Sequence, residues 1–181
     1  FHADSRLVKR FMIPQNATRI VRWALPCLLA IAASPLLAVP SSVEHSPGSH
    51  TFGEAPDVTQ REPAIPREDE TVDLFFRVSF QFTYNRVALY YTTNGSEPAG
   101  AFGVGNVGTL VLSNAGGQIT FVRNENTPEG VRDWWKVTLP ISTRGFNQTI
   151  RYKIGAWDTG GGGEVQAVDG GQGFTFTNKL A

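Results

Sequence analysis

The sequence predicts an all-β protein: an immunoglobulin-like or fibronectin-like β-sandwich of about seven strands. Three observations lead to this fold class. Apolar residues alternate with polar ones at period two in several segments of strand length. Gly, Asn and Pro separate these segments at short intervals, and no helical period follows residue 38. Many short strands divided by turn residues are typical of two antiparallel sheets packed face to face.

Residues 133–158 form the centre of the predicted sandwich. Two segments, 133–140 and 149–158, alternate with period two, so every second side chain points to the same side of its strand. The side chains that we expect in the core are Trp135, Val137, Leu139, Ile150, Tyr152 and Ile154. Trp134 and Trp157 occupy the opposite faces of the same two strands.

Five further segments complete the expected set of strands. They are residues 72–80, 86–93, 109–113, 118–123 and 173–177. The turn residues of 94–98 and 114–117 follow two of them and favour chain reversals. Cys27 is the only cysteine, so the Cys-Trp-Cys framework of antibody-type domains is absent from this sequence and a fibronectin-like or enzyme-associated sandwich fits better.

Residues 1–38 are expected to comprise upstream residues followed by a secretory signal peptide. Arg19 and Arg22 precede an apolar run, and Ala38 supplies the small residue of a cleavage site. The alternative is a membrane anchor, but residues 23–38 contain two prolines and are shorter than the ~20 apolar residues that span a bilayer. We therefore expect no stable membrane span after cleavage, and a secreted, periplasmic or extracellular location.

The charge balance argues against nucleic acid as a partner. The full chain has a formal net charge of zero, whereas residues 39–181 carry 11 Lys and Arg against 15 Asp and Glu, a net charge of −4. Proteins that bind nucleic acid present basic patches to the phosphates. Because Cys27 leaves with the signal, the exported domain has no disulfide and depends on its core.

Residues 39–70 are predicted to be an extended linker, which leaves 71–181 as the sandwich domain. Prolines stand at 40, 47, 56, 63 and 66, and the few apolar residues between them show no period. His45 and His50 lie in this segment. Two histidines four residues apart bind one metal ion readily on a helix, but Pro47 and Gly48 oppose a helix in this segment, so we predict no metal site here.

Other motifs that suggest chemistry are weak in context. The glycine-rich residues 103–108 precede a predicted strand instead of a helix, so we do not predict a nucleotide cofactor. Asp158, Asp169 and the carbonyls of residues 160–163 are the candidate ligands of a calcium site, but their spacing matches no known calcium loop. Residues 68–70 are adjacent acids in the predicted linker, where acids are usually solvated. We therefore predict no catalytic residue, cofactor or metal within this chain.

Three outward-facing aromatic residues are the candidate binding residues: Tyr90, Trp134 and Trp157. Flat aromatic faces contact the apolar side of a sugar ring, so an exposed patch of these side chains would suit carbohydrate. The alternative is that they are buried, either in the core of the sandwich or against another domain. Strand alternation leaves both alternatives open.

Two stretches resemble a known family. Residues 86–98, RVALYYTTNGSEP, resemble a strand and turn of immunoglobulin-like modules in secreted carbohydrate-active enzymes. DWWKVTLP at 133–140 and IRYKIGAWD at 150–158 are similar to strands of the N-terminal modules that precede the catalytic barrel in alpha-amylase family enzymes. The resemblance covers roughly residues 72–177. It implies a β-sandwich that packs on the catalytic barrel and in some members contributes to glucan binding.

Two functional hypotheses from different classes follow. The first is a non-catalytic accessory module of a secreted glycoside hydrolase that acts on alpha-glucans such as starch, with the catalytic domain downstream in the same polypeptide. The alternative is a free-standing fibronectin-like extracellular adhesion or surface module with no enzymatic partner. A third hypothesis, an independent small hydrolase, lacks any Gly-x-Ser-x-Gly elbow in the sequence. The reading frame beyond Ala181 distinguishes the first two hypotheses.

Overall fold

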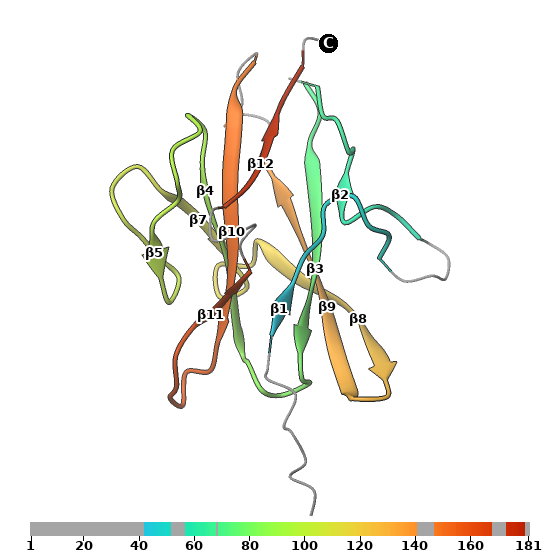
Figure 1. Ribbon diagram of the computed structural model, residues 1–181. Helices are drawn as coiled ribbons and strands as arrows, with labels where there is room; N and C mark the ends of the chain where they lie inside the picture. Colours follow the sequence, from blue (N-terminus) through green and yellow to red (C-terminus); the bar gives the residue numbers. More distant parts are fainter. Residues whose placement is uncertain (1–41, 52–56, 68, 141–146, 168–172, 180–181) are drawn as a thin grey trace, which may run out of the picture. The chain divides into compact units, whose positions relative to one another are not determined.

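The computed structural model describes residues 42–51, 57–67, 69–140, 147–167 and 173–179 (Figure 1). The predicted signal peptide at 1–38 and the calcium candidate Asp169 lie outside these residues. Every regular element in the described part of the chain is a β-strand, which confirms the all-β prediction. Among the same residues, no helix has the length and apolar character needed to cross a membrane.

The first sheet holds five antiparallel strands. Along the sheet the order is β1 (Val43–Glu44), β3 (Val72–Ser79), β9 (Gly130–Leu139) and β8 (Ile119–Thr127), and β2 (Arg61–Glu62) also pairs with β3. Trp134 of β9 lies opposite Arg77 of β3, and Glu44 of β1 lies opposite the same arginine. The registers of the two strand pairs therefore place Glu44, Arg77 and Trp134 in a row across the sheet.

The second sheet also holds five antiparallel strands and faces the first across the core (Figure 1). Its order is β11 (Val165–Ala167), β10 (Thr149–Trp157), β4 (Arg86–Thr92) and β7 (Leu110–Ser113), and β12 (Phe174–Thr177) also pairs with β10. A small separate hairpin consists of β5 (Gly100–Ala101) and β6 (Val104–Gly105).

The core is made by the inward faces of the long strands. Of the residues predicted to face inward, Val137, Leu139, Ile150, Tyr152 and Ile154 are buried, and Trp135 packs at the margin of the same cluster. A fully buried side chain of this size stabilises the fold by roughly 1.5–3 kcal/mol relative to exposure. The period-two pattern therefore identifies the core correctly.

The seven predicted strands correspond to β3, β4, β7, β8, β9, β10 and β12. The structure adds β1, β2, β5, β6 and β11, each of which has only two or three residues. An alternation of apolar and polar residues cannot be recognised over so few positions. β1, β2 and β11 instead pair with a longer neighbouring strand, and β5 and β6 pair with each other.

Two of the added strands correct the predicted linker at residues 39–70. Val43 of β1 is buried and pairs with Val78, and Arg61 of β2 pairs with Leu74. His45 is also buried, directly after β1. The described part of this segment is therefore part of the sandwich, and the boundary predicted at residue 71 is wrong for these residues.

Candidate functional site

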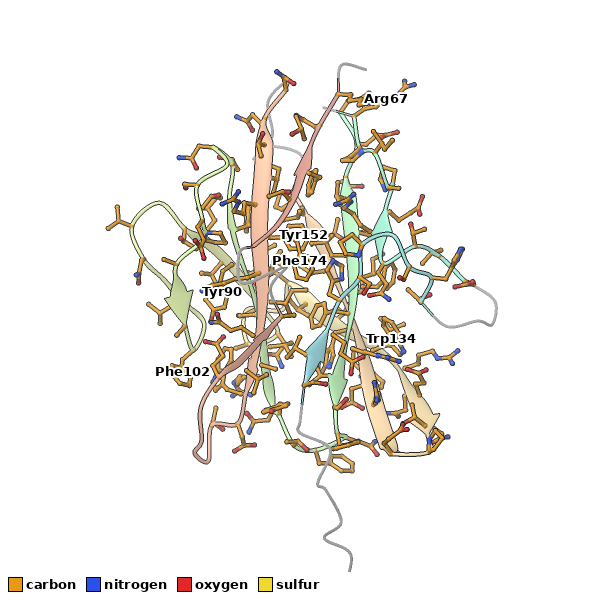
Figure 2. All side chains as sticks on the ribbon, viewed as in Figure 1. Arg67, Tyr90, Phe102, Trp134, Tyr152 and Phe174 are labelled. Atoms are coloured by element: carbon orange, nitrogen blue, oxygen red, sulfur yellow. The ribbon has the colours of Figure 1, made fainter. Side chains whose placement is uncertain are left out.

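The three candidate aromatic residues face outward from their sheets, yet each is buried. Trp134 is 1% exposed, Trp157 8% and Tyr90 0%. Trp134 lies on β9 of the first sheet and Tyr90 on β4 of the second (Figure 2). Trp157 lies on β10, also in the second sheet. They therefore do not form one exposed aromatic patch, and the structure agrees with the alternative in which they are covered.

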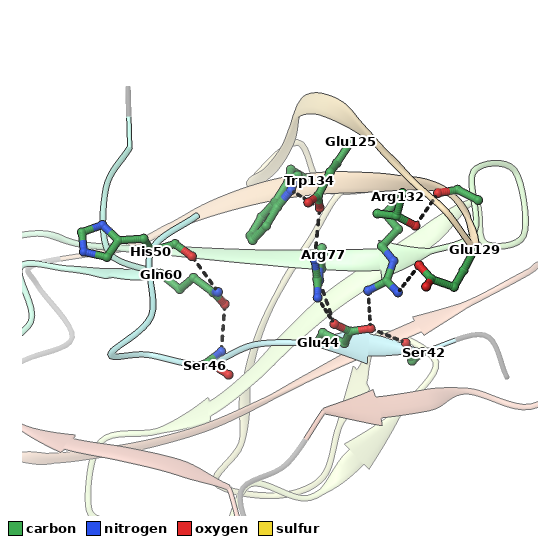
Figure 3. Close-up of polar contacts among 12 residues, drawn as sticks. Ser42, Glu44, Ser46, His50, Gln60, Arg77, Glu125, Glu129, Arg132 and Trp134 are labelled. Atoms are coloured by element: carbon green, nitrogen blue, oxygen red, sulfur yellow. Dashed lines mark hydrogen bonds and ion pairs between the residues drawn. The ribbon is translucent and has the colours of Figure 1, made fainter. Parts of the chain in front are cut away.

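Charged side chains cover Trp134 (Figure 3). The Arg77 guanidinium lies over its ring, 6.0 Å from the centroid, and its indole Nε1–H donates to the Glu125 carboxylate at 3.0 Å. Arg77 also forms ion pairs with Glu125 at 3.2 Å and with Glu44 at 2.6 Å. Arg77, which pairs with both the Glu44 and the Glu125 carboxylates, thus covers the indole ring.

The same ionic network extends to β1. Glu44 accepts hydrogen bonds from Arg132 at 2.7 Å and from the Ser42 hydroxyl at 2.9 Å. Burial raises the pKa of the Glu44 carboxyl, but Arg77, Ser42 and Arg132 outweigh that effect and hold the pKa below its ordinary value. Glu44 is therefore a charged partner for two arginines, which fastens β1 to β3 and β9.

A polar cavity of about 250 Å³ lies beside Trp134. Residues on its walls include Glu44, Ser46, His50, Gln60, Arg77 and Trp134. The Gln60 side chain bridges the cavity wall, since it accepts from the Ser46 amide at 2.8 Å and donates to the His50 carbonyl at 3.2 Å. These groups offer both donors and acceptors to a ligand that carries hydroxyl groups.

This cavity contains residues that the sequence did not single out for binding. Gln60 and Ser46 lie in the predicted linker, and only the structure shows that this segment folds over the first sheet. Arg77 alternates outward on its strand, but the pattern cannot show that it covers Trp134. Within the described residues, no group of three or more His, Cys, Asp or Glu is arranged to hold a metal ion.

Tyr90 and Trp157 support the β5–β6 hairpin on the other sheet. The Tyr90 hydroxyl donates to Glu164 at 2.6 Å and accepts from the Gly103 amide at 2.7 Å, while the Phe102 amide donates to Glu164 at 2.9 Å. Burial raises the pKa of Tyr90, and the hydrogen bond and negative charge of Glu164 raise it further. Tyr90 is therefore a neutral bridge between the sheet and the hairpin.

The other carboxylates that stand near strand ends also have local partners. Asp133 accepts from Asn124 at 2.6 Å, and burial raises its pKa above the ordinary value despite this bond. Asp158 accepts from the Gly160 amide, which closes its own turn. Glu164 holds the hairpin, as described above. These acids thus serve local structure in different parts of the sandwich and do not converge on one site.

The fold and this geometry define a β-sandwich domain with a polar cavity on one sheet and a tethered hairpin on the other. No protein-family model matches the sequence, and no curated protein matches it. Among solved structures, the chain is similar to the cycloalternan-forming enzyme from Listeria monocytogenes in complex with pentasaccharide substrate, at 19% identity and a TM-score of 0.49 over 76% of this chain.

A second similar structure is an uncharacterized protein of Listeria monocytogenes EGD-e in complex with alpha-D-glucose, beta-D-glucose, magnesium and calcium. The identity is 20% and the TM-score 0.45, again over 76% of this chain. The match covers 10% of each of these two chains, so this chain corresponds to about a tenth of their length.

Proposed function

We propose that this chain is a non-catalytic accessory module of a secreted glycoside hydrolase that acts on alpha-glucans. The observation that carries the proposal is where the family-like residues lie in the fold. They form β4, β9 and β10, which occupy the interior of the two sheets. The resemblance thus concerns the strands that organise the sandwich, and it extends to the turn that follows β4.

That turn gives the family-like sequence TTNGSEP a structural basis. The Asn94 side chain accepts from the Ser96 amide at 3.1 Å and from the Ser96 hydroxyl at 2.7 Å. Gly95 has a φ of 76°, a conformation that glycine adopts without strain. The Thr92 hydroxyl donates to the Ser96 carbonyl at 2.5 Å. Thr92, Asn94 and Gly95 therefore serve the turn directly, as the turn of a shared module requires.

A structural role also accounts for the acids near Trp134. Glycoside hydrolysis uses one carboxyl group as an acid and a second as a base or nucleophile, and both face the substrate. Glu44 and Glu125 are instead bound on either side of Arg77. This arrangement supports binding or packing as the role of the module, with catalysis assigned to a domain downstream in the same polypeptide.

For glucan contact, we propose the cavity beside Trp134. Of the three candidate aromatic residues, Trp134 lies on the wall of the polar cavity described above. Its neighbours there supply donors and acceptors for sugar hydroxyls. Tyr90 and Trp157 lie beneath the hairpin, and we propose that they support it.

Affinity electrophoresis in soluble starch tests glucan contact. We expect the native protein to be retarded, and Trp134→Phe to be retarded less, because the substitution removes the indole N–H that holds Glu125 and reshapes the cavity wall. Ile65→Ala is the control, since Ile65 is exposed and is not among the residues of this cavity. A native protein that migrates equally with and without starch would eliminate glucan binding from the proposal.

A further inference from the structure

Exposed apolar side chains gather in one part of the sequence. Eight large hydrophobic residues are exposed in the described part of the chain, and six of them lie between residues 102 and 122. These six residues, which we call the uncharged surface, are Phe102, Val104, Val107, Leu110, Phe121 and Val122. Single exposed hydrophobic residues are ordinary on a protein surface, but a concentration of them marks an interaction site.

The same stretch carries no charge. Asp, Glu, Lys and Arg make up 18% of the chain, yet none occurs from Pro98 to Val122. Charged residues are depleted at the centre of protein interfaces, because burying an unpaired charge is costly. The apolar exposure and the absence of charge therefore coincide in one stretch of the sequence, which runs from the β5–β6 hairpin through β7 into β8.

The hairpin that carries Phe102 and Val104 is fixed in place. The amides of Phe102 and Gly103 are bound by Glu164 and Tyr90, and the Lys153 ammonium donates to the Gly100 carbonyl at 3.2 Å. Phe102 also contacts Trp157 edge to face, with 6.0 Å between ring centroids. A surface that is ordered before binding loses little conformational entropy when it docks.

The hairpin continues into an edge at which the core is open. β7 ends the second sheet and β8 ends the first, and a tight turn at residues 114–117 joins them. Leu110 lies opposite the buried Tyr91, and Phe121 lies opposite Trp135, so both occupy inward positions. They are nevertheless 46% and 50% exposed. A partner that covers this edge would continue the hydrophobic core.

We propose that the uncharged surface docks on an apolar, uncharged face of a folded protein domain. On the basis of the proposed function, that domain is the catalytic domain of the same polypeptide. The chemistry of the surface favours this occupant over two others. Membrane-binding segments carry clusters of several basic residues, whereas residues 98–122 have none, and Arg123 and Lys153 are the basic residues known to stand beside them. A polysaccharide requires flat aromatic faces with polar neighbours, whereas four of the six residues are Val or Leu.

Cysteine labelling of the intact secreted polypeptide tests this proposal. Val107→Cys reports on the uncharged surface, and Ile65→Cys is the control because Ile65 is exposed outside it. Cys27, the only native cysteine in this chain, lies in the predicted signal peptide and is changed to Ser wherever that segment is retained. We expect a maleimide to label both positions at similar rates in the 181-residue chain alone. In the intact polypeptide, Val107→Cys should react at least tenfold more slowly, and Ile65→Cys should be unaffected.

Equal labelling of Val107→Cys in the chain and in the intact polypeptide would overturn the docking proposal and leave the proposed function standing. A reading frame that closes directly after Ala181 would overturn both. Val104→Cys provides a second position on the same surface, and we expect it to be protected to a similar degree. Docking through this surface is supported if the labelling rates of Val104→Cys and Val107→Cys both decrease in the intact polypeptide while that of Ile65→Cys is unchanged.

Discussion

His45 is the residue whose protonation should most affect the stability of the sandwich. Its Nδ1–H donates to the Phe75 carbonyl at 2.7 Å, and in the neutral ring Nε2 accepts from the Tyr152 hydroxyl at 2.8 Å. Burial lowers its pKa from 6.5 to about 4, and the nearby positive charge of Arg61 contributes in the same direction. Protonation of Nε2 would force Tyr152 to accept this bond instead of donating it, and would place a positive charge in a buried site.

The lowered pKa of His45 predicts the direction of a pH effect on stability. Between pH 6.5 and pH 4 the unfolded chain binds a proton at this site and the folded chain does not, so stability is full above pH 6.5 and falls as the pH decreases to 4. The loss assigned to His45 is about 3 kcal/mol. Between pH 6.5 and pH 4, we expect the free energy of unfolding of His45→Gln to fall by about 3 kcal/mol less than that of the native protein. Urea unfolding at a series of pH values measures this difference.

His50→Gln is the matched control, because His50 is an exposed histidine in the same segment. Its pH profile should keep the full loss seen in the native protein. If the free energies of unfolding of the native protein and His45→Gln ran parallel from pH 7 to pH 4, His45 would have no role in acid stability.

Strand alternation predicts the side of the sheet to which a side chain points, but not which other side chains cover it. Trp134 faces away from the core as the pattern indicates, yet Arg77 and Glu125 bury it. Arg77 comes from a strand more than fifty residues away in the sequence, and a single sequence holds no local sign of that pairing. The exposure of an outward aromatic residue therefore could not be predicted from the sequence.

Among the elements, the β5–β6 hairpin depends on a glycine in β10. A Cβ at Gly155 would overlap the Glu164 carboxylate, which lies directly over this position. Alanine usually stabilises a strand relative to glycine. We expect Gly155→Ala to lower the free energy of unfolding by about 1–3 kcal/mol instead, because a displaced Glu164 releases the Phe102 amide and the Tyr90 hydroxyl.

Denaturant unfolding and amide hydrogen exchange measure this effect. The Phe102 and Gly103 amides should exchange faster in Gly155→Ala, because their acceptors belong to the displaced network. Gly163→Ala is the control, since a Cβ there meets no atom within 4 Å and the φ of Gly163 is not in the left-handed range. A Gly155→Ala protein as stable as the native one would show that Glu164 is dispensable for holding the hairpin.

Elements of different length were predictable to different degrees. The long strands such as β9 and β10 alternate over enough residues to show their period, and the structure contains them close to the predicted bounds. β1 and β2 have two residues each and gain their place from pairing with β3. Prolines around them suggested a linker, but Pro47 lies in the loop after β1 and Pro63 in the loop after β2.

For the whole molecule, the sandwich presents two sides of different character. One sheet carries a charged network and a polar cavity over Trp134, and the second carries a fixed hairpin that leads to an uncharged, partly open edge. This division fits a module with one surface for a polar ligand and another for a neighbouring domain. The fold class and the core followed from the sequence, whereas both surfaces depend on contacts between distant segments.

We propose that this sandwich is one module of a longer, secreted glycoside hydrolase. The sequence of the transcript beyond Ala181, combined with the mass of the secreted polypeptide that contains the sandwich, tests this claim. We predict that the reading frame stays open into a domain with the alternating strands and helices of a catalytic barrel, and that the secreted polypeptide has the corresponding mass. A stop codon directly after the last strand, with a secreted product no larger than this chain, would contradict the claim and favour a free-standing adhesion module.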